Sequence, residues 1–179
     1  STAMVNYAMI LEKDNLEEAI KYYKMAIDLD NVVAMTNYGS IMDDKDNKSE
    51  ALKYYKMAAD KGYNVAMYNY AVMLEDGEGV PQNKQEALKY YLLAADSGNE
   101  DSMLSCAFLM FYGDGVPENK EDGIKYFKMA ANCGNKTALK KIIDILKKEN
   151  NVPIDEEEAM MYLKMAEQEE EKEEEFNDE

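Results

Sequence analysis

The sequence predicts an all-α fold, a solenoid of about five antiparallel helix pairs. The first observation is a repeat: residues 77–98, GEGVPQNKQEALKYYLLAADSG, return 36 positions later as residues 113–134, GDGVPENKEDGIKYFKMAANCG. The second is a helix-start signal that recurs in register with an aromatic pair, and the third is apolar spacing typical of helices. A fixed period of roughly 20–50 residues indicates small units that bury their apolar faces only against their neighbours.

The helix-start signals lie seven residues before the first aromatic residue of each pair. These aromatic residues are Tyr22, Tyr54, Tyr90, Tyr126 and Tyr162, with gaps of 32, 36, 36 and 36 residues. The signals are Asn15, Asn47, Asn83, Asn119 and Asp155, and the acids three residues further on are Glu18, Glu50, Glu86, Asp122 and Glu158. An Asn or Asp that caps the first amides, with a carboxylate reaching back, resembles a capping box.

The residues after each signal have helical spacing. Ala87, Tyr90, Tyr91 and Ala94 stand at i, i+3, i+4 and i+7, which places them on one face of a helix. Small alanines beside large rings allow two helices to approach closely. The pattern therefore predicts tightly packed helix pairs, and the glycines expected to end three of the second helices are Gly62, Gly98 and Gly134.

A first helix precedes each signal, so the chain reads as one repeat domain over residues 1–167. The predicted pairs span residues 3–30, 34–61, 66–97, 102–133 and 138–167, and residues 168–179 form an acidic extension that we expect to be helical. Where the period is 36, a Gly-x-Gly-Val-Pro turn at 77–81 and 113–117 joins the two helices. The fifth pair keeps only Asn151-Val152-Pro153 of this turn.

Composition excludes several classes of function. The formal charge is −17, from 37 acidic residues and 20 basic residues that are all lysine, and the chain has no histidine. Without histidine or arginine, the imidazole ligands and bases and the bidentate phosphate contacts are absent. We therefore expect no catalytic residues, no cofactor, no metal, no nucleic acid and no membrane among the ligands. A basic partner is favoured, mainly through its rate of association.

These motifs together resemble the Sel-one-like repeat, a longer-turned relative of the tetratricopeptide repeat. The residues that carry the resemblance are Ala66, Tyr70, Ala71, Leu74, Gly77, Gly79, Val80, Ala87, Tyr90, Tyr91, Ala94, Ala95 and Gly98, with the 113–134 copy beside them. The resemblance covers residues 3–167. It implies a right-handed superhelix whose first helices line a concave groove, and it implies a scaffold or adaptor that holds other proteins together.

The resemblance also suggests which side chains line the groove. The small residues expected to face the partner helix are Ala8, Gly39, Ala71, Ala107 and Ile143. By the same analogy, the partner-binding residues are Tyr68, Val72, Glu75, Leu104, Phe108 and Phe111, with Glu12, Asp43 and Glu75 as an acidic ladder along one edge. Such a strip suits a peptide or helix with an apolar anchor and basic residues. In the alternative interpretation, Leu104, Phe108 and Phe111 pack against the next repeat.

Two further functions stay open at this point. The first pair leaves apolar surface open, so either the sequence begins partway along a longer array, or the first pair drives homo-oligomerisation as a homodimer or larger structural element. Hydrolysis is disfavoured, because no nucleophile lies beside a base in the sequence. Cys106 and Cys133 are interpreted as reduced thiols of a cytoplasmic protein, although a disulfide between them and a leader removed before residue 1 both fit the sequence.

Overall fold

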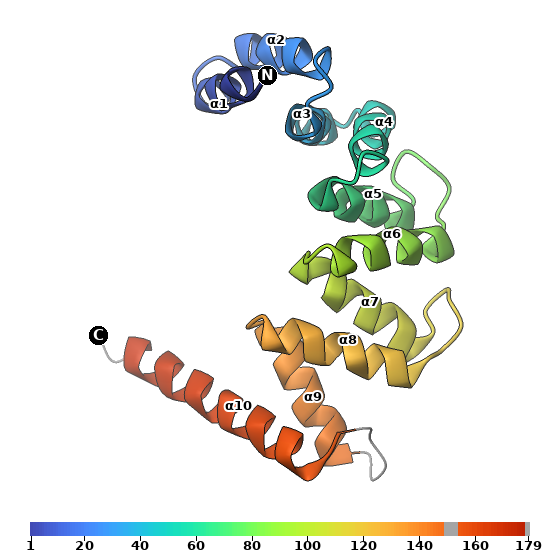
Figure 1. The fold of residues 1–179 in the computed structure, drawn as a ribbon, viewed down its shortest axis with the longest axis vertical. Coiled ribbons are helices and arrows are strands. Elements are labelled where there is room, and N and C mark those ends of the chain that lie inside the picture. Colours follow the sequence, from blue (N-terminus) through green and yellow to red (C-terminus); the bar gives the residue numbers. More distant parts are fainter. Residues whose placement is uncertain (149–153, 178–179) are drawn as a thin grey trace. The chain divides into compact units, whose positions relative to one another are not determined.

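The computed structural model describes residues 1–148 and 154–177, and these ranges contain ten α-helices and no β-strand (Figure 1). The helices are α1 (Thr2–Leu11), α2 (Leu16–Ile27), α3 (Val32–Asp44), α4 (Lys48–Ala59), α5 (Asn64–Asp76), α6 (Lys84–Asp96), α7 (Glu100–Tyr112), α8 (Lys120–Asn132), α9 (Lys136–Lys148) and α10 (Glu156–Asn177). The predicted all-α class is confirmed. The predicted turn at Asn151-Val152-Pro153 and the last two residues of the acidic extension lie outside the described residues.

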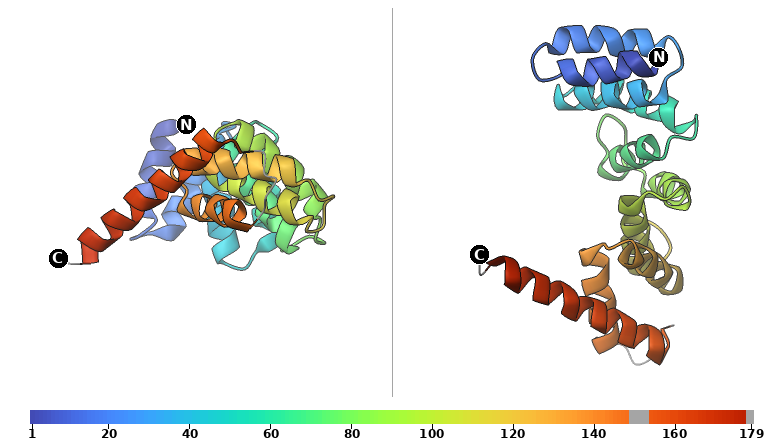
Figure 2. Two further views of the ribbon diagram at one scale, coloured as in Figure 1. Left: turned by 90° about the horizontal axis from the view of Figure 1, so that it is seen from below. Right: turned by 60° about the vertical axis from the view of Figure 1, so that its left-hand side comes forward.

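The chain divides into two compact units, residues 1–99 and 100–179. The first unit contains the pairs α1–α2, α3–α4 and α5–α6, and the second contains α7–α8 and α9–α10. Within each unit, a second helix packs against the first helix of its own pair and against the first helix of the next pair (Figure 2). The boundary between the units therefore falls between the third and fourth predicted pairs.

The predicted caps form in four of the five second helices. The side-chain oxygens of Asn15, Asn83, Asn119 and Asp155 accept from the backbone N–H three residues later. The acid reaches back to the asparagine side chain instead of the backbone, as in the 3.0 Å bond from Asn15 Nδ2 to Glu18 Oε2. Asn47 differs, because its side chain makes only this second bond, from Nδ2 to Glu50 Oε2 at 2.9 Å.

The second aromatic residue of each pair lies in the core. Tyr23, Tyr55, Tyr91 and Phe127 are at most 4% exposed. In the second pair, Tyr55 faces the small residue expected on the first helix, and the contact is tight: a Cβ added at Gly39 would lie 2.9 Å from the Tyr55 ring. The alternation of small and aromatic residues therefore allows the two helices of a pair to lie close together.

Gly123 on α8 occupies a position where other second helices carry alanine, and the structure shows the reason. The other second helices carry Ala19, Ala51 and Ala87 at this position. A Cβ on Gly123 would lie 2.8 Å from both the backbone nitrogen and the Cβ of Phe111 on the paired helix. Backbone atoms cannot move away cheaply, so the glycine is required by the closeness of α7 and α8.

This contact makes a prediction about stability. We expect Gly123→Ala to lower the free energy of unfolding by about 1–2 kcal/mol, because overpacking costs more than the roughly 1 kcal/mol that alanine gains in helix propensity. Urea unfolding followed by circular dichroism would measure the change, with Ser49→Ala at an exposed position of α4 as control. A variant as stable as the parent would contradict the overpacking argument.

Candidate partner-binding surfaces

The most open aromatic surface of the second unit lies on α7. Leu104, Phe108 and Tyr112 are spaced by four residues and share one face of the helix. Leu104 and Phe108 are half-buried, and Tyr112 is 50% exposed. The rings of Phe108 and Tyr112 are stacked, with centroids 6.2 Å apart and planes 12° from parallel. We call these three residues the α7 surface.

A lysine from α9 lies over the rings of the α7 surface. Lys141 Nζ is 5.1 Å from the centroid of the Tyr112 ring and 5.8 Å from that of Phe108. The negative face of an aromatic ring attracts a cation at such distances. The α7 surface therefore combines apolar area with ring faces that accommodate a positive charge.

Phe111 requires a correction. It was predicted to line the groove, but it is only 7% exposed and its ring lies between α7 and α8, 5.8 Å from the ring of Phe127. The Gly123 contact described above holds it there. Phe111 therefore contributes to the core and is unavailable to a partner.

In the first unit, the predicted residues Tyr68, Val72 and Glu75 lie on one face of α5 and are partly exposed. We call them the α5 surface. The ring of Tyr68 is tilted against that of Tyr91, with centroids 5.9 Å apart. Glu75 Oε2 accepts a 2.7 Å hydrogen bond from the Tyr91 hydroxyl. This surface is therefore supported from below by the core tyrosine of the same pair.

The other carboxylates of the predicted acidic ladder also have partners inside the chain. Glu12 accepts a short hydrogen bond from the Tyr23 hydroxyl, which in turn accepts from Asn37 Nδ2 at 3.2 Å. Asp43 Oδ1 lies 2.7 Å from Lys48 Nζ, which also pairs with Glu78 on the following turn at 2.7 Å. The ladder residues thus stabilise helix pairs, and their charge is shared with internal donors.

Burial changes the acidity of the core tyrosines. Loss of solvent around Tyr55 is the main cause that raises its pKa to about 12. Burial is also the main cause at Tyr38, whose pKa rises to about 12 with further help from its hydrogen bond to Glu50. The pKa of Tyr23 is raised by burial and by Glu12. These hydroxyls therefore stay protonated at pH values where an exposed tyrosine would ionise.

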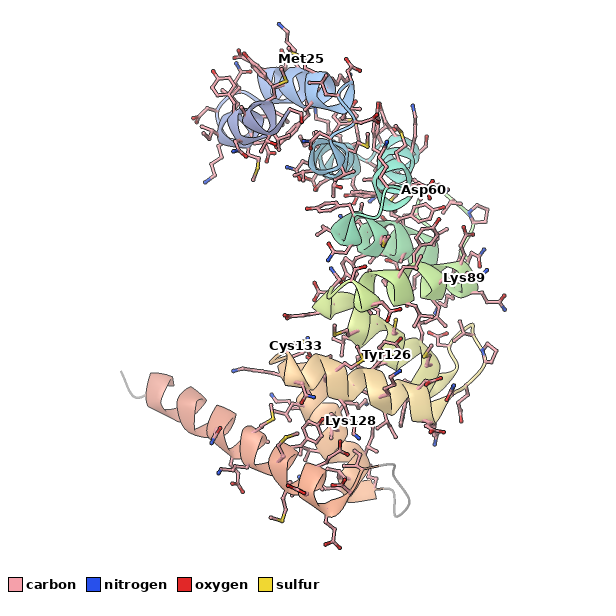
Figure 3. The ribbon with its side chains drawn as sticks, in the orientation of Figure 1. Met25, Asp60, Lys89, Tyr126, Lys128 and Cys133 are labelled. Carbon is pink, nitrogen blue, oxygen red and sulfur yellow. The ribbon has the colours of Figure 1, made fainter. Side chains whose placement is uncertain are left out.

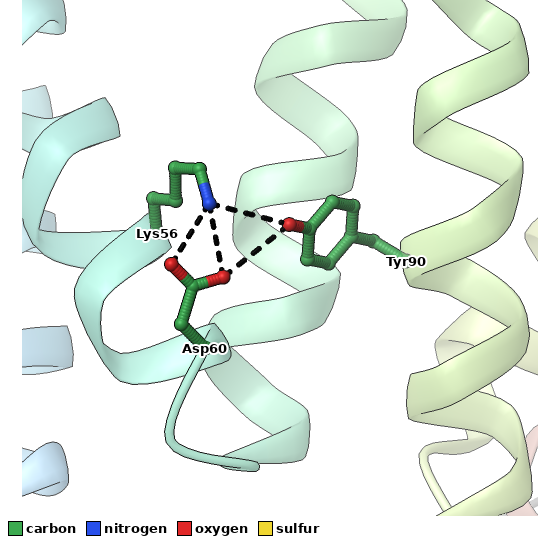
Figure 4. Close-up of polar contacts among 3 residues, drawn as sticks. All are labelled: Lys56, Asp60 and Tyr90. Atoms are coloured by element: carbon green, nitrogen blue, oxygen red, sulfur yellow. Dashed lines mark hydrogen bonds and ion pairs between the residues drawn. The ribbon is translucent and has the colours of Figure 1, made fainter.

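A second kind of polar contact joins consecutive pairs in the first unit (Figure 4). Lys56 and Asp60 on α4 form an ion pair at 2.8 Å, and the Tyr90 hydroxyl on α6 donates to Asp60 Oδ1 at 3.4 Å. Lys56 Nζ also lies 5.8 Å from the centroid of Tyr70 on α5. These residues connect α4 to both helices of the following pair.

Among the described residues, neither the cysteines nor possible metal ligands are assembled into a site. Cys106 is buried in α7, and Cys133 is exposed at the end of α8, where Figure 3 labels it. The described part of the chain holds no group of three or more His, Cys, Asp or Glu side chains suited to a metal ion. Within the same residues, no helix combines the length and hydropathy that a bilayer crossing requires.

The sequence analysis identified neither Tyr112 on the α7 surface nor Lys141 over its rings. Tyr112 continues the Leu104–Phe108 spacing by four more residues, so this spacing was a usable signal. Lys141 is different. The analogy with the Sel-one-like repeat suggests that Lys140, not Lys141, lines the groove, and only the rotation of α9 in the structure directs Lys141 toward the rings.

The comparisons with known proteins agree with this architecture. The model of the Sel1 repeat matches residues 1–31, 33–63, 64–99, 101–135 and 148–169. No functionally curated protein matches the chain. A Sel1 repeat protein from Oxalobacter formigenes is similar in structure, with a TM-score of 0.79 and 23% identity over 93% of this chain and 72% of that one.

Two further solved structures are similar. A protective antigen of uropathogenic Escherichia coli strains, described as displaying an SLR fold, has a TM-score of 0.73 and 21% identity, over 92% of this chain and 36% of the antigen. The cysteine-rich protein B of Helicobacter pylori has a TM-score of 0.59 and 23% identity, over 72% of this chain and 96% of that protein. At these identities, the likeness concerns the fold. The chain spans about a third of the E. coli protein.

The buried tyrosines predict how stability depends on pH. Because the folded pKa of Tyr38 and Tyr55, about 12, lies above the unfolded value of 10, their contribution is complete below pH 10. It is lost as the pH rises toward 12. We therefore expect the melting temperature to fall over this interval, together with a delayed rise in tyrosinate absorbance.

The variant Tyr55→Phe supplies the test of this assignment. It removes one titrating group from the core, so its melting temperature should fall less steeply with pH than that of the parent. An equal slope in parent and variant would show that Tyr55 does not contribute to the alkaline transition.

Proposed function

Because Sel1 repeat matches extend over most of its length, the chain belongs to the Sel1 repeat family, and we propose that it is a scaffold that binds a partner protein. Proteins of this family generally mediate protein–protein interaction and are typically non-enzymatic. The finer proposal is that the partner is a peptide or helix with an apolar anchor, held by the exposed faces of first helices. The main contact of this proposal is the α7 surface of the second unit, and the α5 surface of the first unit is a separate candidate contact.

The observation that carries this proposal is the exposure of stacked rings on α7. Aromatic side chains are enriched at the energetic centres of protein interfaces, because they bury a large area with few rotatable bonds. Half of Tyr112 is exposed, and Phe108 beneath it rests edge-on against the core ring of Phe127 at 5.1 Å. An exposed ring on a rigid support loses little conformational freedom when a partner covers it.

The chemistry of the partner follows from charge and from the ring faces. The chain carries a formal charge of −17, so a basic partner associates faster than a neutral or acidic one. Lys141 shows that an ammonium group fits against the rings of Phe108 and Tyr112. A lysine or arginine of the partner can occupy a similar position while an apolar residue packs on Leu104.

The α7 surface makes a prediction for binding. We expect a Phe108→Ser, Tyr112→Ser double variant to lose at least about tenfold in affinity for its partners, as is typical when central aromatic contacts are removed. Partners captured from a lysate of the source cells would be quantified by mass spectrometry and then titrated individually against each variant. Raising the salt concentration should weaken basic partners through slower association.

Leu93→Ser provides the matched control, because Leu93 is an exposed apolar residue of α6, at 51%, and belongs to neither surface. Phe111 is left unchanged, since its replacement would open a cavity in the core. Circular dichroism would establish that each variant is folded. Equal retention of every partner by the folded double variant and by the Leu93 control would refute the assignment of the α7 surface.

A further inference from the structure

Positive charge is concentrated on one of the first helices. α1, α3, α5 and α7 contain no lysine, whereas five of the 13 residues of α9 are lysine. Asp144 is the single acid of α9, so five lysines and one aspartate give this helix a formal charge of +4. The chain as a whole carries −17, and its other first helices are neutral or acidic. α9 is therefore the positively charged member of this set.

Four lysines of α9 lie on the side of the helix that is turned away from the core. The residues on the other side are buried, and they are Ala138, Leu139, Ile142, Ile143 and Ile145. The four lysines are Lys140, Lys141, Lys147 and Lys148, which we call the α9 row. Lys141 is half-buried, and the other three are exposed. Packing of the core therefore does not account for these charges.

The α9 row has no acidic partner in the part of the chain that the structure describes. None of the four ammonium groups there forms an ion pair, although Asp144 stands three or four residues from each of them. Lysines in the last turn of a helix interact favourably with the negative end of its dipole, which accounts for Lys147 and Lys148. Lys140 and Lys141 stand in the middle of α9, where this effect is absent. Their charge is therefore available to another molecule.

Lys141 joins the α9 row to the α7 surface. Its Nζ atom lies 5.1 Å from the centroid of the Tyr112 ring and 5.8 Å from that of the Phe108 ring. In the register of the repeats, the other first helices carry an uncharged side chain at this position. These residues are Asn6, Asn37, Asn69 and Ser105. The rings of α7 and the lysines of α9 therefore lie side by side in the second unit.

Local charge decides which group of a partner fits beside the rings. At physiological salt concentration the Debye length is about 8 Å, so a group in contact with α9 responds mainly to the α9 row. The charge of −17 acts at longer range, on the net charge of an approaching partner. While Lys141 lies over the rings, it repels an ammonium group at its outer side and attracts a carboxylate. A partner that is basic overall can therefore still present acidic residues to α9.

We propose that the α9 row binds an acidic segment of the partner whose apolar anchor packs on the α7 surface. This contact rests on the proposed function, which supplies the anchor, and adds the partner's acids beside it. One carboxylate pairs with Lys141, and a segment that continues across the outer face of α9 brings a second one to Lys140. The partner is therefore a protein in which an aromatic or aliphatic residue stands close in sequence to several Asp or Glu residues.

Two other occupants are less favourable on grounds of charge. A second copy of the chain supplies nine acids and one lysine at residues 167–179, but the formal charge of −17 on each copy opposes association. A single-stranded nucleic acid can stack a base on exposed rings, but the same charge repels a polyanion. A partner protein that is basic elsewhere avoids both penalties.

The test is an unbiased selection of peptides. A phage-displayed library of random peptides is panned against the intact chain and, in parallel, against two folded double variants. The lysine variant is Lys140→Gln, Lys141→Gln, and the ring variant is Phe108→Ser, Tyr112→Ser. The parent should enrich peptides that combine an aromatic or aliphatic residue with Asp or Glu. The lysine variant should lose the enrichment in acids and retain that in apolar residues, whereas the ring variant should lose the apolar enrichment, so the two proposals fail independently.

A selected peptide then gives the strength of the contact. Fluorescence anisotropy should show that the lysine variant binds it about two- to thirtyfold more weakly than the parent, the range expected for two ion pairs at a protein surface. The matched control is Lys21→Gln, Lys89→Gln, which has the same formal charge as the lysine variant. It changes two exposed lysines of α2 and α6, of which Figure 3 labels Lys89, and it should bind like the parent. Added salt should weaken the parent more than the lysine variant.

The proposal is overturned if the folded parent enriches no acidic peptides, or enriches lysine and arginine instead. It is also overturned if the lysine variant and the charge-matched control bind the selected peptide equally, because any effect would then follow net charge. Concentration-dependent dimerisation in sedimentation velocity that the lysine variant abolishes would assign the α9 row to residues 167–179 of a second copy. Binding of a labelled single-stranded oligonucleotide that the same variant loses would assign the row to nucleic acid.

Discussion

In α2, α4, α6 and α8, the fold depends on two adjacent aromatic rings that serve two different contacts. Neighbouring residues of an α-helix point about 100° apart, so Tyr54 and Tyr55 cannot face the same side. Tyr55 turns into its own pair and lies against Gly39, while Tyr54 packs edge-on against Tyr38 in the layer shared with the preceding pair. One dipeptide thus closes a pair and joins it to its neighbour.

Typical free energies indicate which contacts stabilise the junctions between helix pairs and which mainly fix the register of one pair on the next. Burying a large apolar side chain stabilises a fold by about 1.5–3 kcal/mol, and an edge-to-face ring pair adds about 0.5–1.5 kcal/mol. The ion pair of Lys56 and Asp60, with side chains 45% and 53% exposed, contributes at most about 1 kcal/mol. The rings and alanines therefore supply most of the stability. The lysine and aspartate fix the register of one pair on the next.

The sequence predicts an interaction well when the residues that make it are close together in the chain. The caps at Asn15, Asn83 and Asn119 depend on residues three positions apart, so their spacing predicted them correctly. Phe111 was misplaced, because its direction is decided by Gly123 on another helix. No local pattern in either segment records that contact.

The positions of the proposed binding residues on the helices were predicted in part for the same reason. Leu104 and Phe108 lie on a continuous face of α7, and regular spacing is sufficient to place them there. The acidic ladder was expected to face a partner, yet its oxygens accept from groups on other helices, as Glu75 does from Tyr91. Which carboxylates meet a hydroxyl depends on how far the second helix rotates against the first, and helical periodicity alone does not define that rotation.

The third and fourth pairs differ at the two positions whose side chains meet between their helices. In the third pair, Tyr91 carries a hydroxyl that needs an acceptor, and Glu75 supplies it from the end of α5. In the fourth pair, phenylalanine occupies both equivalent positions, and a buried phenyl ring requires no acceptor. Phe111 can then sink into the core, provided that Gly123 leaves space for it. The end of α7 exposes Tyr112 where the third pair carries the exposed Asp76, so the aromatic surface at this end comes from a further difference between the two pairs.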